Sequence, residues 1–129
     1  MKLIDFVNES SQVRMVDPAA VTATGTLGQS VDLQGFQGRV LLLIALGAVT
    51  GTTPTLDLKV QDSADNSSFA DATTAITLAQ LVTASAAKVF ALAVDVRSVR
   101  RYIKLYGTAG GTTPSFTMSV AVVGQKQII

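Results

Sequence analysis

The 129-residue sequence contains no cysteine, no histidine and no tryptophan. Without cysteine, neither a disulfide bond nor thiolate chemistry is available within the chain. Without histidine, the chain lacks the commonest general base, the commonest metal ligand and the side chain that titrates near neutral pH. Catalytic arrangements of the Ser-His-Asp and Cys-His kinds are therefore excluded. We expect no enzyme activity, no cofactor and no metal.

Charged residues are also scarce, at 15% of the chain with a formal net charge of +1. A nucleic-acid-binding protein would show a basic excess or stripe, so nucleic acid is not an expected partner. The longest apolar run, residues 40–46, is far shorter than a membrane span, and residues 1–5 do not have the form of a signal peptide. We therefore expect no membrane contact, and synthesis in the cytoplasm.

Aliphatic residues supply most of the hydrophobicity, because only 5% of the residues are aromatic in a chain that is 48% hydrophobic. The mean hydropathy of +0.43 is high for a small domain. An excess of apolar residues over the needs of one core indicates apolar surface that is buried in an assembly.

One eight-residue pattern occurs twice. Residues 47–54 read Gly-Ala-Val-Thr-Gly-Thr-Thr-Pro, and residues 107–114 read Gly-Thr-Ala-Gly-Gly-Thr-Thr-Pro. Gly tolerates positive φ, and the residue before Pro is pushed towards extended geometry. Each copy is therefore predicted to be the loop of a β-hairpin whose second strand begins at Pro. The copies reflect either an internal duplication or two hairpins that converged on one loop chemistry.

Apolar and polar residues alternate after each copy, which is typical of half-buried strands. The same alternation recurs over residues 88–96 and 100–106, whereas residues 39–46 are almost continuously apolar, as in a strand covered on both faces. Turn residues at short spacing divide the chain into about eight strands. We predict an all-β fold, an antiparallel β-sandwich, with a jelly roll as its favoured form. The predicted inward residues after the two copies are Leu56, Leu58, Val60, Phe116, Met118, Val120 and Val122.

A single sandwich domain is expected over residues 19–129. Residues 1–18 lack sustained alternation and are interpreted as an N-terminal arm or edge strand, in which Val13 and Met15 are candidate contacts with a neighbouring subunit. An arm that packs on its own domain is the alternative.

Three groups of polar or aromatic residues are candidate sites. Asp62, Asp65, Asn66 and Asp71 carry the oxygen ligands that Ca²⁺ prefers, but their spacing does not match an EF-hand loop and a plain turn explains them better. The basic residues Arg97, Arg100, Arg101 and Lys104 either bind an anion or an acidic partner surface, or form a solvated strand edge. Tyr102 and Tyr106 share an outward face, where they stack on a sugar, anchor a protein interface or pack within the fold.

Two stretches resemble known β-sandwich proteins. Residues 96–105, which contain Arg-Tyr-Ile-Lys-Leu, resemble a strand of galactose-binding-like jelly rolls. Residues 58–69, which contain Val-Gln-Asp-Ser-Ala-Asp and end in Phe69, resemble the strand and loop of small virion proteins of tailed phages. From Val21 to Lys126 the chain resembles the phage capsid decoration, or cement, proteins.

The resemblance implies a non-enzymatic protein that binds the outside of the assembled major capsid protein shell, often as a trimer, and reinforces it. It therefore implies a virion location, the major capsid protein as partner, and a homo-oligomer with a trimer favoured. The expected contacts are the N-terminal arm, the basic strand and the loop residues Thr52, Thr53, Thr112 and Thr113. The alternative within the same class is a tail, baseplate or fibre module that binds glycans through Tyr102 and Tyr106.

Overall fold

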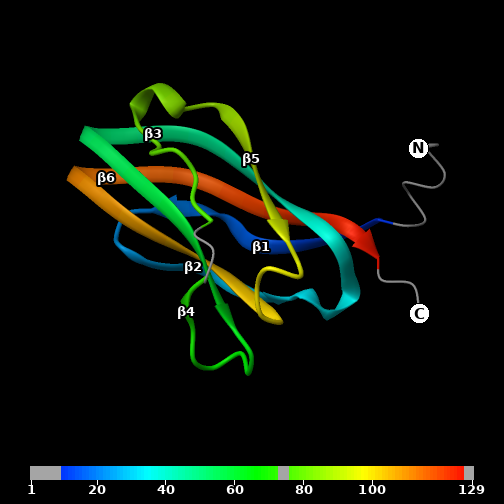
Figure 1. Cartoon of the computed structure of the whole chain (residues 1–129). Coiled ribbons are helices and arrows are strands. Elements are labelled where there is room, and N and C mark those ends of the chain that lie inside the picture. Colours follow the sequence, from blue (N-terminus) through cyan, green and yellow to red (C-terminus); the bar gives the residue numbers. More distant parts are fainter. Residues whose placement is uncertain (1–9, 73–75, 127–129) are drawn as a thin grey trace.

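The computed structural model describes residues 10–72 and 76–126, and six antiparallel strands dominate them (Figure 1). Two of the strands are unusually long. The strands and the two short 3-10 helices are β1 (Ser10–Val21), β2 (Gly25–Asp32), η1 (Leu33–Gly35), β3 (Phe36–Ser63), β4 (Ala70–Asp71), η2 (Thr83–Ser85), β5 (Lys88–Asp95) and β6 (Tyr102–Lys126). No helix among the described residues is long and apolar enough to cross a membrane.

The fold is built on one long ribbon formed by β3 and β6. They pair antiparallel from Phe36 opposite Lys126 to Ser63 opposite Tyr102. Midway, both strands change direction together, at the left of Figure 1, so that the ribbon folds over on itself. The two halves of the ribbon thereby become the centres of two packed layers.

The other strands extend these two layers. The layer that we name the β1–β5 layer consists of β1, residues 114–126 of β6, residues 36–50 of β3, and β5. The β2–β4 layer consists of β2, residues 102–110 of β6, residues 54–63 of β3, and β4. Residues 76–81 join the second layer through isolated bridges to Leu56 and Lys59.

The core lies between the layers and is aliphatic. Alternate residues of both halves of the ribbon belong to one buried cluster, and Val40, Leu42, Ile44, Leu56, Ile103, Leu105 and Phe116 have no exposed surface. The seven inward residues predicted after the two repeat copies are all buried. The prediction of an all-β antiparallel sandwich is confirmed, whereas the jelly-roll form stays a prediction. Six strands replace the predicted eight because β3 and β6 keep their pairing through the bend.

The bend coincides with the two copies of the repeated pattern, which lie against each other. Thr52 is opposite Thr112 in the register. Gly51 and Gly111 have φ angles of +115° and +93°. A Cβ atom on Gly51 would lie 2.7 Å from the carbonyl oxygen of Thr113, and one on Gly111 would overlap the carbonyl oxygen of Thr53. Each copy requires glycine because the backbone of the other copy packs against it.

The prediction that each repeat is the loop of a β-hairpin is therefore wrong, because the two strands that flank a repeat do not pair with each other. The strands on either side of a hairpin loop pair with each other. Here the strand before each copy and the strand after it lie in different layers, and both pair with the strands that flank the other copy. As their position between two core strands suggests, the repeats lie at corners of the sandwich. These corners are bends of a folded two-stranded ribbon and not loops of hairpins.

The described part of the N-terminal segment belongs to the sheet. β1 pairs with β6 from Ser10 to Val21, and the register shifts between Arg14 and Val16 and again between Val16 and Ala19. The strand runs without interruption through residue 18, where the boundary between arm and domain is predicted. Residues 1–9 lie outside the described part of the chain.

We predict that Gly111→Ala destabilises the protein by about 2–4 kcal/mol, because the new Cβ combines an unfavourable positive φ with overlap of the Thr52 and Thr53 carbonyls. Urea unfolding measures the change. The matched control is Gly35→Ala, where a Cβ meets open space, and its expected effect is within about 0.5 kcal/mol. Equal effects of the two substitutions would contradict the role of the bend.

Candidate functional site: the outer surfaces of the sandwich

The predicted contact residues do not converge on one site. Thr52, Thr53, Thr112 and Thr113 are all exposed at the folded end of the ribbon, and we name this group the corner tip. Thr53 and Thr113 each have a φ of 45°, so the two copies present the same backbone shape. The basic residues and tyrosines lie elsewhere, on the β2–β4 layer and the loop before it.

Of the two candidates on β1, only Val13 is accessible. Its exposed fraction is 36%, whereas Met15 is 1% exposed and belongs to the core cluster. The register shift after Arg14 turns two successive residues, Met15 and Val16, into the buried cluster. The prediction for Met15 is corrected accordingly, since a buried side chain is not available to a partner.

The outer surface of the β2–β4 layer, which we name the polar face, carries the predicted outward residues of β6. Ile103 and Leu105 are buried, so Tyr102, Lys104 and Tyr106 point away from the core, as predicted. Each aromatic ring on this face already has a cation above it. Lys59 lies 5.1 Å from the centre of the Tyr106 ring, Arg101 lies 4.9 Å from that of Tyr102, and Lys104 lies 4.5 Å from that of Phe69.

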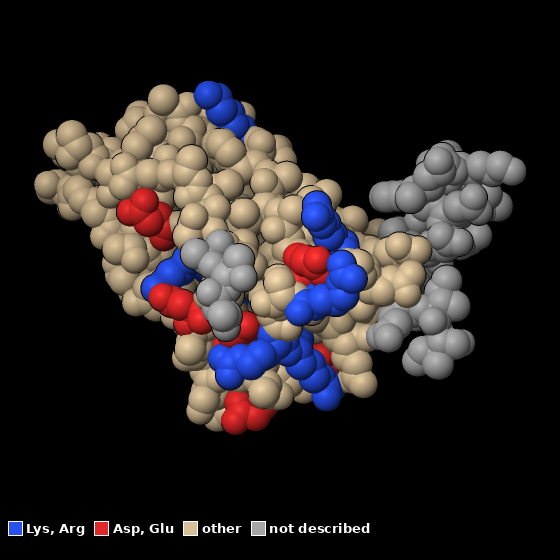
Figure 2. Space-filling model, viewed as in Figure 1, with Lys and Arg blue, Asp and Glu red and all other residues tan. Residues whose placement is uncertain are grey.

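The arginines of the basic group are each bound to a separate carboxylate. Arg101 binds both carboxylate oxygens of Asp32 through two hydrogen bonds of 3.0 and 2.8 Å, which lower the pKa of Asp32. Arg97 binds Asp95, and this contact lowers the pKa of Asp95 in the same way. Because acidic and basic side chains are interspersed on this side of the molecule (Figure 2), the basic group does not form a continuous anion-binding surface.

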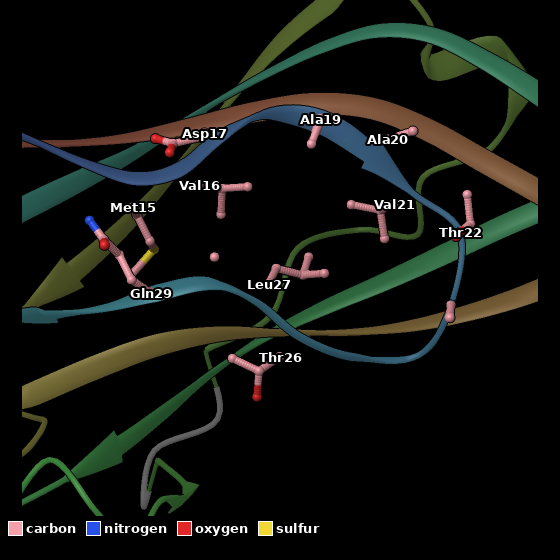
Figure 3. Close-up of a pocket in the computed structure, with 12 residues that line it drawn as sticks. Met15, Val16, Asp17, Ala19, Ala20, Val21, Thr22, Thr26, Leu27 and Gln29 are labelled. Carbon is pink, nitrogen blue, oxygen red and sulfur yellow. The ribbon is translucent and has the colours of Figure 1, made fainter.

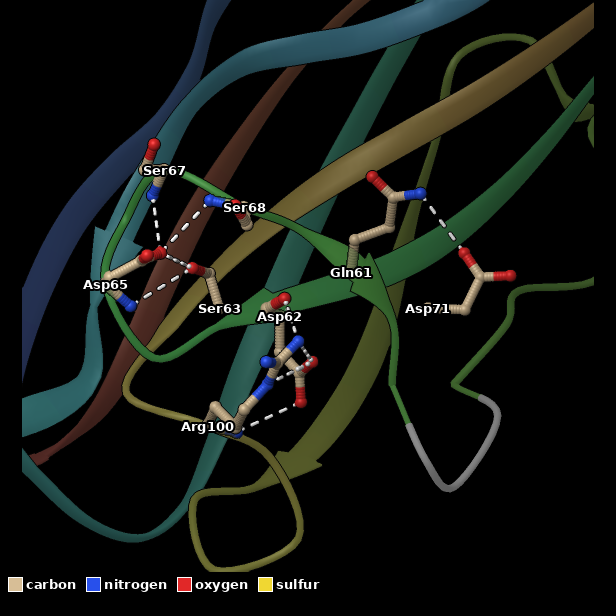
Figure 4. Close-up of polar contacts among 8 residues, drawn as sticks. All are labelled: Gln61, Asp62, Ser63, Asp65, Ser67, Ser68, Asp71 and Arg100. Atoms are coloured by element: carbon tan, nitrogen blue, oxygen red, sulfur yellow. Dashed lines mark hydrogen bonds and ion pairs between the residues drawn. The ribbon is translucent and has the colours of Figure 1, made fainter.

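The pair formed by Arg100 and Asp62 is the most buried of these contacts (Figure 4). The Asp62 carboxylate is 5% exposed and accepts hydrogen bonds from Nε and Nη2 of Arg100 at 3.0 and 2.9 Å, and from its backbone N–H at 3.0 Å. Asp62 is the penultimate residue of the long strand β3, and Arg100 lies two residues before the start of β6. The pair therefore fixes the loop after β5 to the ribbon.

The acidic cluster does not converge on a metal site. Asp65 accepts hydrogen bonds from the backbone N–H groups of Ser67 and Ser68 and from the Ser63 hydroxyl, which closes a tight turn (Figure 4). Asp71 instead binds Lys59 and Gln61. The carboxylates are thus bound to separate partners, and the described residues contain no group of three or more potential metal ligands among His, Cys, Asp and Glu.

A cleft of about 490 Å³ opens between β1 and β2, which pair with β6 and not with each other (Figure 3). Val16, Val21 and Leu27 point into the space between these strands. The Gln29 side-chain amide already donates to the carbonyl oxygen of Arg14. The residues that line the cleft are mainly apolar, and the cleft lacks the converging polar groups that orient a small ligand.

In the β1–β5 layer, the outer surface formed by β3, β5 and the adjoining part of β6 is apolar and was not predicted as a site; we name it the apolar face. Val40, Leu42 and Ile44 are buried, so the alternate residues of β3 point outwards. Register places uncharged residues of β6 and β5 on either side of them. The face comprises Leu41, Leu43, Ala45, Val89, Ala91, Ala93, Ser119, Ala121 and Val123.

Exposure on the apolar face is substantial, since Leu41 is 42% exposed and Val89 is 70% exposed. The continuous apolar run over residues 40–46 was the available sequence signal, because it predicts a strand covered on both faces. Within the described chain, only the inner face of this strand is fully covered.

Comparisons with known proteins identify the fold and no family. No family model and no curated protein matches the sequence. Among solved structures, the SPBc2 prophage-derived protein YomS matches with a TM-score of 0.51 and 11% identity, over 90% of this chain and 94% of that one. The VP2 subviral particle of infectious bursal disease virus matches with a TM-score of 0.51 and 14% identity, over 90% of this chain and 32% of VP2. The chain thus spans about a third of the length of VP2 and nearly all of YomS.

We predict that Arg100→Ala costs about 2–3 kcal/mol of folding free energy at neutral pH, because it leaves the buried Asp62 carboxylate without its charged partner. The control is Arg97→Ala, which removes an arginine that is 84% exposed and is expected to change stability by less than about 1 kcal/mol. Denaturant unfolding measures both. Similar small losses for the two variants would contradict the structural role of Asp62.

We predict that the Asp65 carboxyl titrates with a pKa of about 2, below its ordinary 3.8, because the Ser68 N–H, the Ser63 hydroxyl and the Ser67 N–H bind its charged form. A lowered folded-state pKa stabilises the protein above pH 3.8, and this contribution disappears as the pH falls towards 2. Carboxyl NMR titration measures the value. Ser63→Ala should raise the pKa towards 3.8, and an unchanged titration would reject this assignment.

Proposed function

We propose that the chain is a structural protein of a phage virion, a decoration protein that binds the outside of the assembled capsid and stabilises it. The observation that carries the proposal is the two-layer fold, which matches YomS over nearly its whole length and also matches part of VP2. One of these proteins derives from a prophage, and the other forms a subviral particle. The resemblance of residues 58–69 to small virion proteins of tailed phages supports the same class.

The surfaces suit a protein that works by contact rather than by chemistry. Within the described residues, the acidic side chains are bound in turns, in ion pairs or, for Asp57, to the side-chain amide of Gln80, and no potential metal-ligand cluster forms. The corner tip presents four exposed threonines on a glycine-dependent bend. Many weak contacts of this kind, repeated over a shell of major capsid protein, add up to strong attachment. Nucleic acid and membrane are not proposed partners, and the proposed location is the capsid surface after synthesis in the host cytoplasm.

The glycan-binding alternative, a tail, baseplate or fibre module, receives no specific support from the polar face. A sugar that stacks on Tyr102 or Tyr106 would have to compete with the cation above each ring. We therefore keep virion decoration as the proposed function.

Capsids that lack this protein provide the test. Added protein should bind them saturably, at a number of copies comparable to the major capsid protein, and should raise their resistance to heat. The double variant Thr52→Glu, Thr112→Glu places charges on the corner tip, where both residues are exposed, and should weaken binding at least tenfold.

The control variant for this experiment is Ala64→Glu, which adds a charge at an exposed position in the loop after β3, away from the bend in the middle of that strand. It should bind like the unmodified protein. No binding to capsids, or a handful of copies in each purified virion, would reject capsid decoration in favour of a neck or tail role. Equal binding by the double variant would exclude the corner tip as the contact.

A further inference from the structure

The free edges of the two layers differ in how they are protected. An edge strand exposes unpaired backbone N–H and C=O groups, and proteins block pairing there with charges, Pro, bulges or very short strands. β1 carries Arg14, Asp17 and Pro18 and shifts register twice. β2 shifts register once, and β4 has only two residues. Three of the edge strands thus carry a recognised protective feature.

The fourth edge strand, β5, has none of these features over its central part. It pairs with β3 over eight consecutive residues, Lys88 to Asp95, without a shift in register. The six residues between these two charges are Val-Phe-Ala-Leu-Ala-Val, with no Pro, Gly or charge. In the described chain β5 pairs with β3 alone, so its other edge is open to a further strand.

The surface beside this edge points to the same conclusion. Val89, Ala91 and Ala93 are exposed and continue the apolar face of β3 up to the edge. A strand added to β5 would extend the layer and would place further side chains beside Val89, whose exposed fraction is 70%. Backbone hydrogen bonds and apolar burial would then stabilise the contact together.

We propose that β5 pairs antiparallel with β5 of a second copy of this chain, about a two-fold axis. The charges at the ends of the strand favour this direction. Antiparallel pairing keeps the two Lys88 side chains at opposite ends of the joined strands, beside the end where Asp95 is paired with Arg97, whereas parallel pairing would place the two Lys88 side chains together. The interior of the strand is uncharged, so an identical surface can meet itself, as a two-fold interface requires.

The register is limited by the two faces of the strand. Phe90, Leu92 and Val94 face the core side, and the alternate residues belong to the apolar face. Among the registers that keep both core sides on one side of the joined sheet, the two with the greatest overlap of residues 88–95 place Ala91 opposite Ala91 or Ala93 of the second copy. Both registers bring the two Ala91 positions close to the two-fold axis.

Charge at position 91 therefore tests the pairing. The full chain should form a dimer by sedimentation across a dilution series. Ala91→Lys and Ala91→Glu should each be monomeric at concentrations where the unmodified chain is dimeric, because each brings like charges together across the axis. Position 91 is exposed, so both variants should keep the circular dichroism spectrum of the parent. An equal mixture of the two should restore the dimer as a heterodimer.

The matched control is Thr108→Lys, which adds a charge at an exposed position of β6 in the other layer and should leave the dimer unchanged. A monomeric parent chain would overturn the proposal, as would a trimer that persists in both single variants. Failure of the Lys and Glu variants to pair with each other would also overturn it. A dimer that requires residues 1–9 but tolerates both charges at position 91 would assign the contact to that segment instead. These outcomes do not depend on capsid binding.

Discussion

The close contact between the two bends of the β3–β6 ribbon is the constraint on which the rest of the structure depends. Gly51 packs against the Thr112–Thr113 backbone, and Gly111 packs against the Thr52–Thr53 backbone, so each bend holds the other in place. Both glycines have positive φ, which a larger residue adopts only at a cost. The ribbon can therefore fold over without losing its pairing, and the halves on either side become the two layers.

Folding one ribbon over a core also determines the character of the surfaces. The inner sides of both halves contribute to one aliphatic core, but their outer sides differ. One outer side carries lysines, tyrosines and aspartates, which are largely paired with one another. The other is apolar and ends at the open edge of β5. This asymmetry suits a protein with different neighbours on its different sides, as the proposed roles in capsid attachment and self-association require.

Much of the fold could be predicted, because alternation is a local property of the sequence. The buried residues after Pro54 and Pro114 and the inward positions Ile103 and Leu105 follow from a period of two. The pairing at the repeats could not be predicted, since a Gly-Thr-Thr-Pro segment fits a hairpin loop and a strand bend equally well. Met15 was misassigned for a related reason: a bulge changes which side chains face the core, and its position depends on the partner strand.

The sequence by itself determined that this is an all-β chain without histidine or cysteine chemistry, with strands whose faces are set by their alternation. Only the tertiary structure decided that the two repeats pack against each other, that the clustered arginines are each bound to separate carboxylates, and that an apolar surface leads to an unprotected edge. The physical reason is that composition and periodicity depend only on residues that are close together in the sequence. Pairing, charge compensation and exposure depend on residues that meet only when the ribbon folds.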